Sequence, residues 1–378
     1  MSQLSSFISS SSNSGVLRAG AALKVPLWVC ISLVAIDVFI NFVFAYPSDP
    51  KVTNPARLPL YFEYGRSTEG QLSRMTRADR SQTAPITLSG WYDPLEAQEY
   101  PAKSQNPIVT IYGMSHAVRL GQALSRTSDR FTPRTVGAPG ASTNWSYGAF
   151  LRDHGGGKSR AVVLAFMSQN FPMITTLSAM TWTYDLPMPY TSDRFYLDGD
   201  HLGVIHPPYT SFEKYAAAFN DPTKWPVVRD YFAKHDSMYN DFIFHANVLD
   251  HSSLFRLIRR AYAQRVLRDA RNTLLTSDGF RSDSERVQIA RAMIHEFAQQ
   301  ARKDGMIPII FIVNNLGYSD YLFKALHPAL EADKVPYLSS HTIVSPDDPR
   351  GYLPDSHFTD EVDDRLARAL VKVIESSN

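Results

Sequence analysis

The chain is poor in cysteine, in net charge and in the residue spacings that hold metal ions. Its 378 residues include a single cysteine, Cys30, so no disulfide can form within it. The formal net charge is +1, which gives no electrostatic reason to expect a nucleic-acid partner. No His-x-x-x-His or Cys-x-x-Cys spacing occurs, so we expect no metal site, and no motif indicates a cofactor.

One long apolar run lies near the N-terminus. Residues 26–46 are apolar over about the 20 residues that a membrane span needs, and Trp28 and Tyr46 lie near its ends, as interfacial anchors do. Asp37 interrupts the run at a cost of about 2.5–3.5 kcal/mol, which the apolar side chains can offset. We predict an uncleaved signal anchor and expect Asp37 to be tolerated without a partner, the alternative being that it pairs with a partner span. A signal peptide cleaved near residues 43–45 and a buried core helix are the alternatives.

The residues before this run predict its orientation. Residues 1–25 are rich in serine and carry only Arg18 and Lys24 as charges, which is typical of a disordered tail. These cations have no acidic residue beside them, so the positive-inside rule places the tail in the cytoplasm. We expect a single-pass membrane protein whose C-terminal domain is extracytoplasmic, and periplasmic if the source is bacterial.

The chain after residue 106 alternates strand and helix patterns. Such alternation predicts an α/β domain over 107–378, with a parallel sheet covered by helices on both faces. The expected strands are 108–112, 133–137, 161–167, 307–313 and 335–339, and the expected helices are 117–128, 226–235, 253–274, 284–303, 318–332 and 360–375. Residues 47–106 read as an extracytoplasmic linker that packs on this domain and contains a short helix capped by Ser67. Residues 168–250 interrupt the alternation and are rich in aromatic residues, so we expect a lid or binding insertion.

A serine follows the first predicted strand. Ile108 to Tyr112 form a β-branched apolar run, Gly113 ends it, and a helical pattern begins at Ser115. Ligands bind at the carboxyl edge of open α/β sheets, where a helix N-terminus can stabilise an anion. Our hypothesis is that Ser115 is a nucleophile; its alternative role is to cap the following helix.

An acid and a base lie close together before the last predicted helix. Asp355 and His357 share one short loop, so the carboxylate could orient the imidazole while the imidazole takes a proton from Ser115. The alternative is structural, with Asp355 capping the helix or making an Asx turn and His357 packing beside it. We expect His116, next to Ser115, to support the site without reacting.

Four sequence blocks together resemble the SGNH (GDSL-like) hydrolases. They are Gly113-Met114-Ser115-His116-Ala117, Gly137-Ala138-Pro139-Gly140-Ala141-Ser142-Thr143, the segment from Val162 to Asn170, and Asp355-Ser356-His357. The sequence around Ser115 is similar to that of membrane-anchored SGNH domains that transfer or remove acetyl groups on envelope polysaccharides. The resemblance implies a three-layer α/β/α sandwich of the SGNH/flavodoxin-like type. It departs from the family at Met114, where aspartate is usual.

The resemblance also implies roles for individual residues. Ser115, Asp355 and His357 would form the catalytic triad. The oxyanion hole would consist of the Ser115 N–H, Gly140, and an amide from either Gln169 or Asn170. The implied activity is that of a serine esterase or O-acyltransferase.

The implied substrate is an acyl ester of an envelope polysaccharide or a related glycan. The implied partners are the membrane and other envelope polysaccharide-synthesis proteins. The alternative is a non-catalytic envelope protein with a degenerate SGNH fold that binds or scaffolds polysaccharide.

Overall fold

The computed structural model describes residues 14–47, 56–76, 89–93, 105–153, 157–184, 188–199 and 201–377. Within these ranges the chain is mixed α/β, with a five-stranded parallel sheet and twelve α-helices. The predicted class and the parallel sheet are therefore confirmed. The predicted tail lies partly outside the described residues, and its second part is helical, because helix α1 (Ser14–Val43) begins at Ser14.

The main sheet has the strand order β2-β1-β3-β8-β9, with all neighbours parallel. Its strands are β1 (Ile108–Gly113), β2 (Thr132–Gly137), β3 (Ala161–Met167), β8 (Ile307–Val313) and β9 (Tyr337–Ser339). After β1 the chain adds β2 on one side of it and then crosses over to add β3 on the other side. The carboxyl ends of β1 and β3 thus flank the switch point where open α/β sheets bind ligands.

Helices cover both faces of this sheet. Ile111 faces α5 (Ser115–Thr127), where a Cβ on Gly121 would lie 3.8 Å from its Cδ1 atom. The next residue, Tyr112, points to the opposite face and meets Phe150 of α6 (Thr143–Arg152) at 5.6 Å between ring centroids. All seven residues of β3 are buried, which explains why its sequence shows no alternation.

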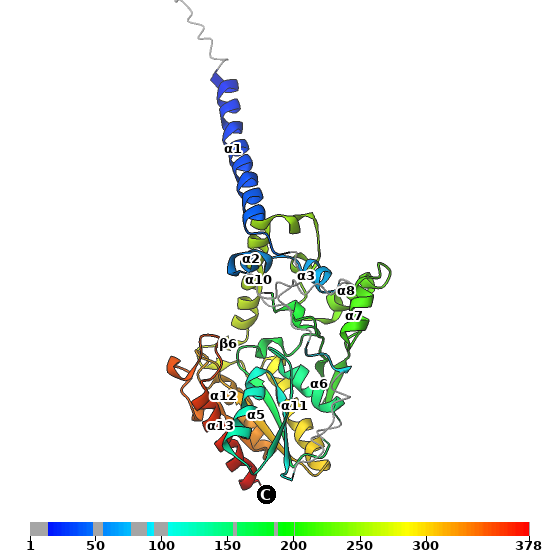
Figure 1. The fold of residues 1–378 in the computed structure, drawn as a ribbon, viewed down its shortest axis with the longest axis vertical. Coiled ribbons are helices and arrows are strands. Elements are labelled where there is room, and N and C mark those ends of the chain that lie inside the picture. Colours follow the sequence, from blue (N-terminus) through cyan, green and yellow to red (C-terminus); the bar gives the residue numbers. More distant parts are fainter. Residues whose placement is uncertain are drawn as a thin grey trace, which may run out of the picture.

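The remaining helices of this part extend the two helical layers. Helix α13 (Asp360–Ser376) packs against α5, while α11 (Glu285–Lys303) packs against β8 and α12 (Tyr321–Ala332). Figure 1 shows the end of the chain, marked C, at the pole opposite α1. Because α13 runs towards that pole, its first turn and the carboxyl edge of the sheet face the half of the molecule that carries α1.

The half beside α1 contains helices of the linker, of the insertion and of the segment that follows it. Its α-helices are α2 (Arg57–Glu63), α3 (Thr68–Met75), α7 (Phe212–Phe219), α8 (Trp225–His235), α9 (Asp241–Phe244) and α10 (Ser253–Asn272).

Two antiparallel pairs, β4 (Arg194–Asp198) with β5 (His201–Ile205) and β6 (Leu275–Thr276) with β7 (Gly279–Phe280), complete the strands of the described chain. The short 3-10 helices are η2 (Phe171–Met173), η3 (Ala179–Thr181), η4 (Val248–His251), η5 (Ser340–Thr342) and η6 (Pro349–Gly351).

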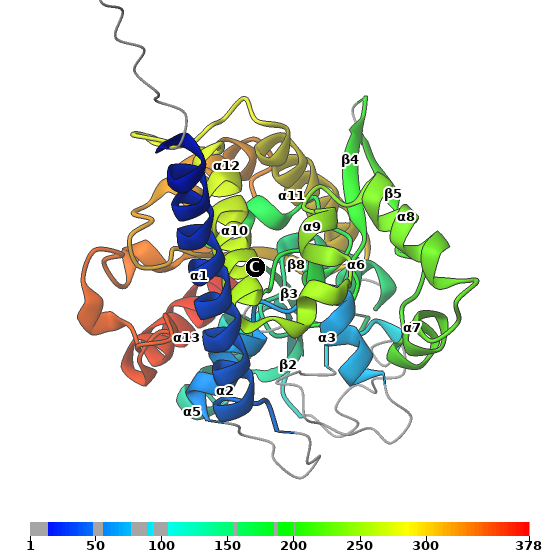
Figure 2. The ribbon, with the colours of Figure 1, turned by 90° about the horizontal axis from the view of Figure 1, so that it is seen from above.

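Helix α1 projects from this half and is long and apolar enough to cross a membrane. Its segment Lys24–Val43 spans 20 residues with a mean hydropathy of 2.1. Figures 1 and 2 show the body-side end of α1 beside α10. On that end Asp37, Ile40 and Asn41 are half-buried, while the residues between Lys24 and Ile36 are exposed. Only the last turns of α1 therefore dock on the body.

The expectation that Asp37 has no partner is wrong. Asp37 Oδ1 accepts the backbone N–H of Leu254 at 2.8 Å, in the first turn of α10. Asn41 Oδ1 accepts hydrogen bonds from Ser253 Oγ at 2.9 Å and from Arg256 Nη2 at 2.7 Å. Both polar residues thus bind the N-terminal end of a second helix, whose first N–H groups have no partner within the helix. Sequence patterns do not show such a long-range pairing.

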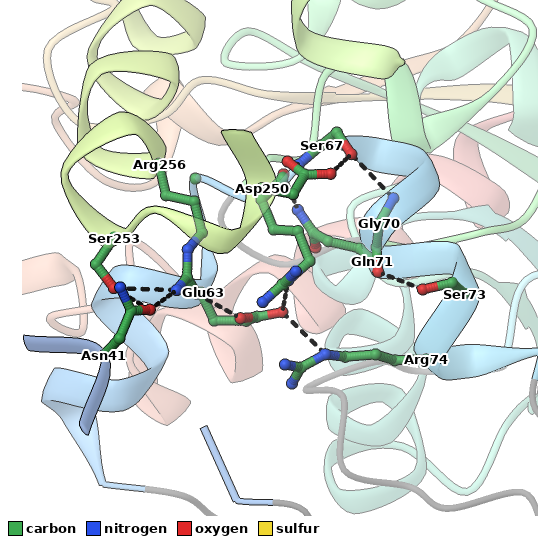
Figure 3. A network of polar contacts seen from close by, with 12 residues as sticks. Asn41, Glu63, Ser67, Gly70, Gln71, Ser73, Arg74, Asp250, Ser253 and Arg256 are labelled. Atoms are coloured by element: carbon green, nitrogen blue, oxygen red, sulfur yellow. Dashed lines mark hydrogen bonds and ion pairs between the residues drawn. The ribbon is translucent and has the colours of Figure 1, made fainter. Parts of the chain in front are cut away.

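Buried charges join α2, α3 and α10 (Figure 3). Glu63 at the end of α2 binds Arg256 at 3.0 Å and Arg74 at 3.2 Å. The Asp250 carboxylate pairs with Arg259 and accepts the Ser67 hydroxyl at 2.5 Å. Ser67 also accepts the Gly70 N–H at 3.0 Å, so the predicted helix cap is confirmed. These contacts fix the linker and the insertion onto one another.

Candidate active site

Ser115 lies at the junction of β1 and α5, at the carboxyl edge of the sheet. The strand ends at Gly113, where a Cβ would lie 2.7 Å from the Cβ atoms of both Ala117 and Ala165. Only glycine allows this close turn from strand to helix. Met114 occupies the N-cap position without a side-chain cap bond, and Ser115 is the first helical residue. The alternative role of Ser115 as the helix cap is therefore wrong.

His357 lies in a tight turn directly before α13. The turn is closed by hydrogen bonds from the Leu353 N–H to the His357 carbonyl at 2.7 Å and from the Ser356 N–H to the Leu353 carbonyl at 2.9 Å. Ser356 holds the left-handed backbone conformation with φ +69°, which is strained for a residue other than glycine. Strained conformations of this kind persist only where surrounding contacts enforce them, and they often occur at functional sites.

The structure brings the three predicted residues into one hydrogen-bonded chain. His357 Nε2 lies 2.6 Å from Ser115 Oγ, across 242 residues of sequence. Its Nδ1 atom lies 3.0 Å from Asp355 Oδ2. An Nδ1–H donated to Asp355 leaves the Nε2 lone pair to accept the serine proton, which is the arrangement that activates a nucleophilic hydroxyl.

Asp355 is placed to remain ionised beside the imidazole. The backbone N–H of His357 donates to its carboxylate at 3.2 Å, and this bond, followed by the bond to the imidazole, lowers the pKa of Asp355. The side chain of Asp355 is 65% exposed, against 25% for His357. Water therefore screens the carboxylate, so its electrostatic effect on the imidazole is weaker than that of a buried acid.

His116 supports the loop that carries His357. Its ring stacks on the His357 ring at 4.8 Å between centroids, and its Nε2 atom lies 3.3 Å from the Ser356 carbonyl oxygen. Burial, with the neighbouring His357, lowers the pKa of His116 to about 3. A ring that stays neutral near neutral pH can pack on the imidazole of His357 without repelling its cationic form.

Gly140 and Asn170 lie together beside the switch point of the sheet. Gly140 adopts φ +60°, a conformation that favours glycine. The buried Asn170 side chain donates from Nδ2 to the carbonyl oxygens of Gly140 at 3.1 Å and Ala141 at 2.7 Å. Both amide hydrogens thus hold the Gly140 loop. The side chain of Gln169 is exposed, and its backbone N–H donates to Asn315 Oδ1 at 3.0 Å.

Residues of the insertion approach the same loop. A Cβ added to Gly140 would lie 3.2 Å from Met188 Cε and 4.0 Å from Trp182 Cη2. The insertion therefore provides apolar side chains beside the Gly140 loop. In the part of the chain that the structure describes, His, Cys, Asp and Glu side chains nowhere gather in a group of three that could hold a metal ion.

Sequence reasoning missed Arg119, which ties the helix that begins at Ser115 to the segment that follows His357. Its guanidinium donates to the Phe358 carbonyl at 3.0 Å, to Asp360 at 2.8 Å and to the buried Asp363 at 2.7 Å. Arg119 lies four residues after Ser115 and so on the same helix face. The cluster of acids at residues 360–364 was the available signal, since it marks a helix start that can bind a cation from a neighbouring helix.

The chain matches no protein-family model and no curated protein sequence.

Proposed function

We propose that the chain is a serine esterase or O-acyltransferase of the SGNH type, built as a three-layer α/β/α sandwich on an N-terminal membrane anchor. One observation carries the proposal: His357 Nε2 lies 2.6 Å from Ser115 Oγ, while its other ring nitrogen meets Asp355. These groups come from opposite ends of the domain and converge at the edge of the sheet where α/β proteins bind ligands. A structural serine would not require this convergence.

The first half of the reaction forms an acyl-enzyme. Ser115 Oγ attacks the carbonyl carbon of an acyl ester, and its proton passes to His357 Nε2. The tetrahedral oxyanion lies near the N–H of Ser115, which has no partner within α5, and near the Gly140 loop held by Asn170. When the intermediate collapses, the ester C–O bond breaks and the leaving alcohol takes the proton from His357.

The second half removes the acyl group. Water or a sugar hydroxyl gives a proton to His357 and attacks the acyl carbon, and the proton then returns to Ser115 as the bond to Ser115 Oγ breaks. Hydrolysis and transfer use the same residues, and the exclusion of water decides between them. The insertion that contributes Trp182 and Met188 lies where it could exclude water.

The proposed substrate is an O-acetylated envelope polysaccharide or a related glycan. We place the α/β domain outside the cytoplasm, with α1 as an uncleaved single-pass anchor and Arg18 and Lys24 on the cytoplasmic side. In this location the acyl acceptor is a surface glycan, and other envelope polysaccharide-synthesis proteins are the expected partners.

Hydrolysis of p-nitrophenyl acetate by the full chain in detergent tests the proposal. We expect Ser115→Ala to lower kcat by at least about 10⁴-fold, because the nucleophile is lost, without changing the unfolding temperature. Ser125→Ala is the matched control, since Ser125 is an exposed serine on the same helix. Mass spectrometry should find an acetyl group on Ser115 in the wild-type chain.

Equal background rates in the wild-type chain and in Ser115→Ala, with no acetylated serine, would contradict the proposal. That result would favour the alternative, a non-catalytic envelope protein that binds or scaffolds polysaccharide.

A further inference from the structure

The end of α1 is fastened to one corner of the body. We define the η4 corner as residues 247–254, which comprise η4 and the first residues of α10. Asp37 accepts the N–H of Leu254, and Asn41 accepts the hydroxyl of Ser253 (Asn41 and Ser253 are labelled in Figure 3). These bonds fix where the η4 corner lies along α1.

The position along α1 at which the η4 corner is bound lies within the apolar segment Lys24–Val43 and not beyond it. Asp37 precedes Val43, the end of the segment, by six residues, which is about 9 Å of helix. The 13 residues from Lys24 to Ile36 span only about 20 Å, whereas the hydrocarbon core of a bilayer is about 30 Å thick. If α1 crosses a membrane, its last two turns are needed to complete the span. The η4 corner, which lies beside those turns, then reaches the lipid.

The polar bonds agree with this position. A carboxylate near the hydrocarbon region is costly unless it is paired, and here the N-terminal end of α10 supplies a backbone N–H with its favourable dipole. The η4 corner is thus the element that satisfies Asp37 at that depth.

The outer surface of the corner carries exposed apolar side chains next to the exposed polar residues Asn247 and His251. Val248 is 79% exposed and Leu249 is 42% exposed. On the adjacent helix α2, Leu58 is 53% exposed and Tyr61 is 48% exposed, with the guanidinium of Arg260 4.1 Å from the Tyr61 ring centroid. Apolar side chains edged by an aromatic ring and a cation are typical of surfaces that lie in the interfacial layer of a membrane.

We propose that the η4 corner and the outer face of α2 rest in the interfacial layer of the lipid bilayer beside α1. The inference depends on the proposed membrane anchor and adds that the body itself contacts lipid. The body is then held at a fixed height and tilt, with the carboxyl edge of the sheet facing the membrane.

Single-cysteine labelling of the full chain tests the contact. Cys30→Ser removes the only native cysteine, and Leu249→Cys or Leu151→Cys then introduces one labelling position. The two leucines form a matched pair because both are 42% exposed, and Leu151 belongs to α6 in the half away from α1 (Figure 1). Each variant carries an environment-sensitive fluorophore and is reconstituted in phosphatidylcholine–phosphatidylglycerol vesicles that contain lipids with a nitroxide near the headgroup.

We expect loss of most of the fluorescence at position 249 and no loss at position 151. Val248→Cys, at the most exposed site of the corner, should repeat the result at 249. If the chain floats with the vesicles but position 249 behaves like position 151, the η4 corner stands in water and the inference is wrong, while the anchor remains. If the chain does not float with the vesicles, the anchor and the inference both fail.

Discussion

In the half of the molecule that contains the sheet, apolar strands such as β3 are buried by helices on both sides, and the buried pair of Arg134 and Asp153 lies beside them. The half beside α1 depends more on ion pairs, which join α2, α3 and α10. Among them, the side chains of Arg259 and Asp250 are only 1% and 6% exposed. Apolar burial tolerates small shifts, while a buried charge needs its own partner in place. The two halves should therefore respond differently to substitution.

The largest expected effect tests the polar half. Arg259→Met leaves the Asp250 carboxylate buried without its cation, so we expect the free energy of unfolding to fall by about 3–5 kcal/mol. Arg268→Met, at an exposed position of the same helix, is the control. Urea unfolding followed by circular dichroism measures both variants. A loss below about 1 kcal/mol for Arg259→Met would mean that the pair resembles a surface ion pair.

The second prediction concerns how the free energy of unfolding depends on pH through His116, a buried residue of the half that contains the sheet. The pKa of His116 is about 3 in the folded chain, below its ordinary value of 6.5. As the pH falls below 6.5, the unfolded chain binds a proton at this residue and the folded chain does not. The stability contributed by the neutral ring is complete above 6.5 and is lost progressively towards pH 3. Between pH 7 and pH 5 the loss is about 2 kcal/mol.

His116→Phe removes this term, so its unfolding free energy should fall less between pH 7 and pH 5 than that of the wild-type chain. Ser125→Ala, at an exposed serine of the same helix that does not titrate in this range, should keep the wild-type slope. Parallel slopes for His116→Phe and the wild-type chain would show that His116 titrates normally.

The smallest expected effect compares two arginines on α5. Arg119 holds the segment that carries His357, whereas Arg126 forms an ion pair with Asp364 at 2.7 Å in which the arginine is 47% exposed. We expect Arg119→Gln to lower kcat about tenfold by misplacing the base, with KM nearly unchanged. Arg126→Gln should change kcat little, because exposed pairs contribute at most about 1 kcal/mol. Equal kcat values for the two variants would remove Arg119 from the site.

Burial explains both what the sequence could predict and what it could not. All five strands of the main sheet were expected within two residues of their observed ends, because buried parallel strands appear as short β-branched runs between turn residues. Helix α6 was missed. Its residues from Thr143 to Phe150 are all buried, so the sequence lacks the polar face that marks a surface helix.

The candidate site was predictable where chain order and strand ends decide position. Ser115 and His357 each sit beside an element end that the pattern reveals, and elements of a parallel sheet bring such ends to one edge. The partners of Asn170, Arg119 and Asp37 were not predictable, because hydrogen bonds between distant polar side chains leave no periodic trace in a single sequence.

The bond between Ser115 and His357 also sets an order of events during synthesis. Because the two residues lie 242 positions apart, the ribosome completes the apolar segment and Ser115 long before it makes His357. If α1 is the proposed anchor, a growing chain can reach a membrane while Ser115 still lacks its imidazole. Under the proposed function, chemistry begins only when the last helix closes the domain.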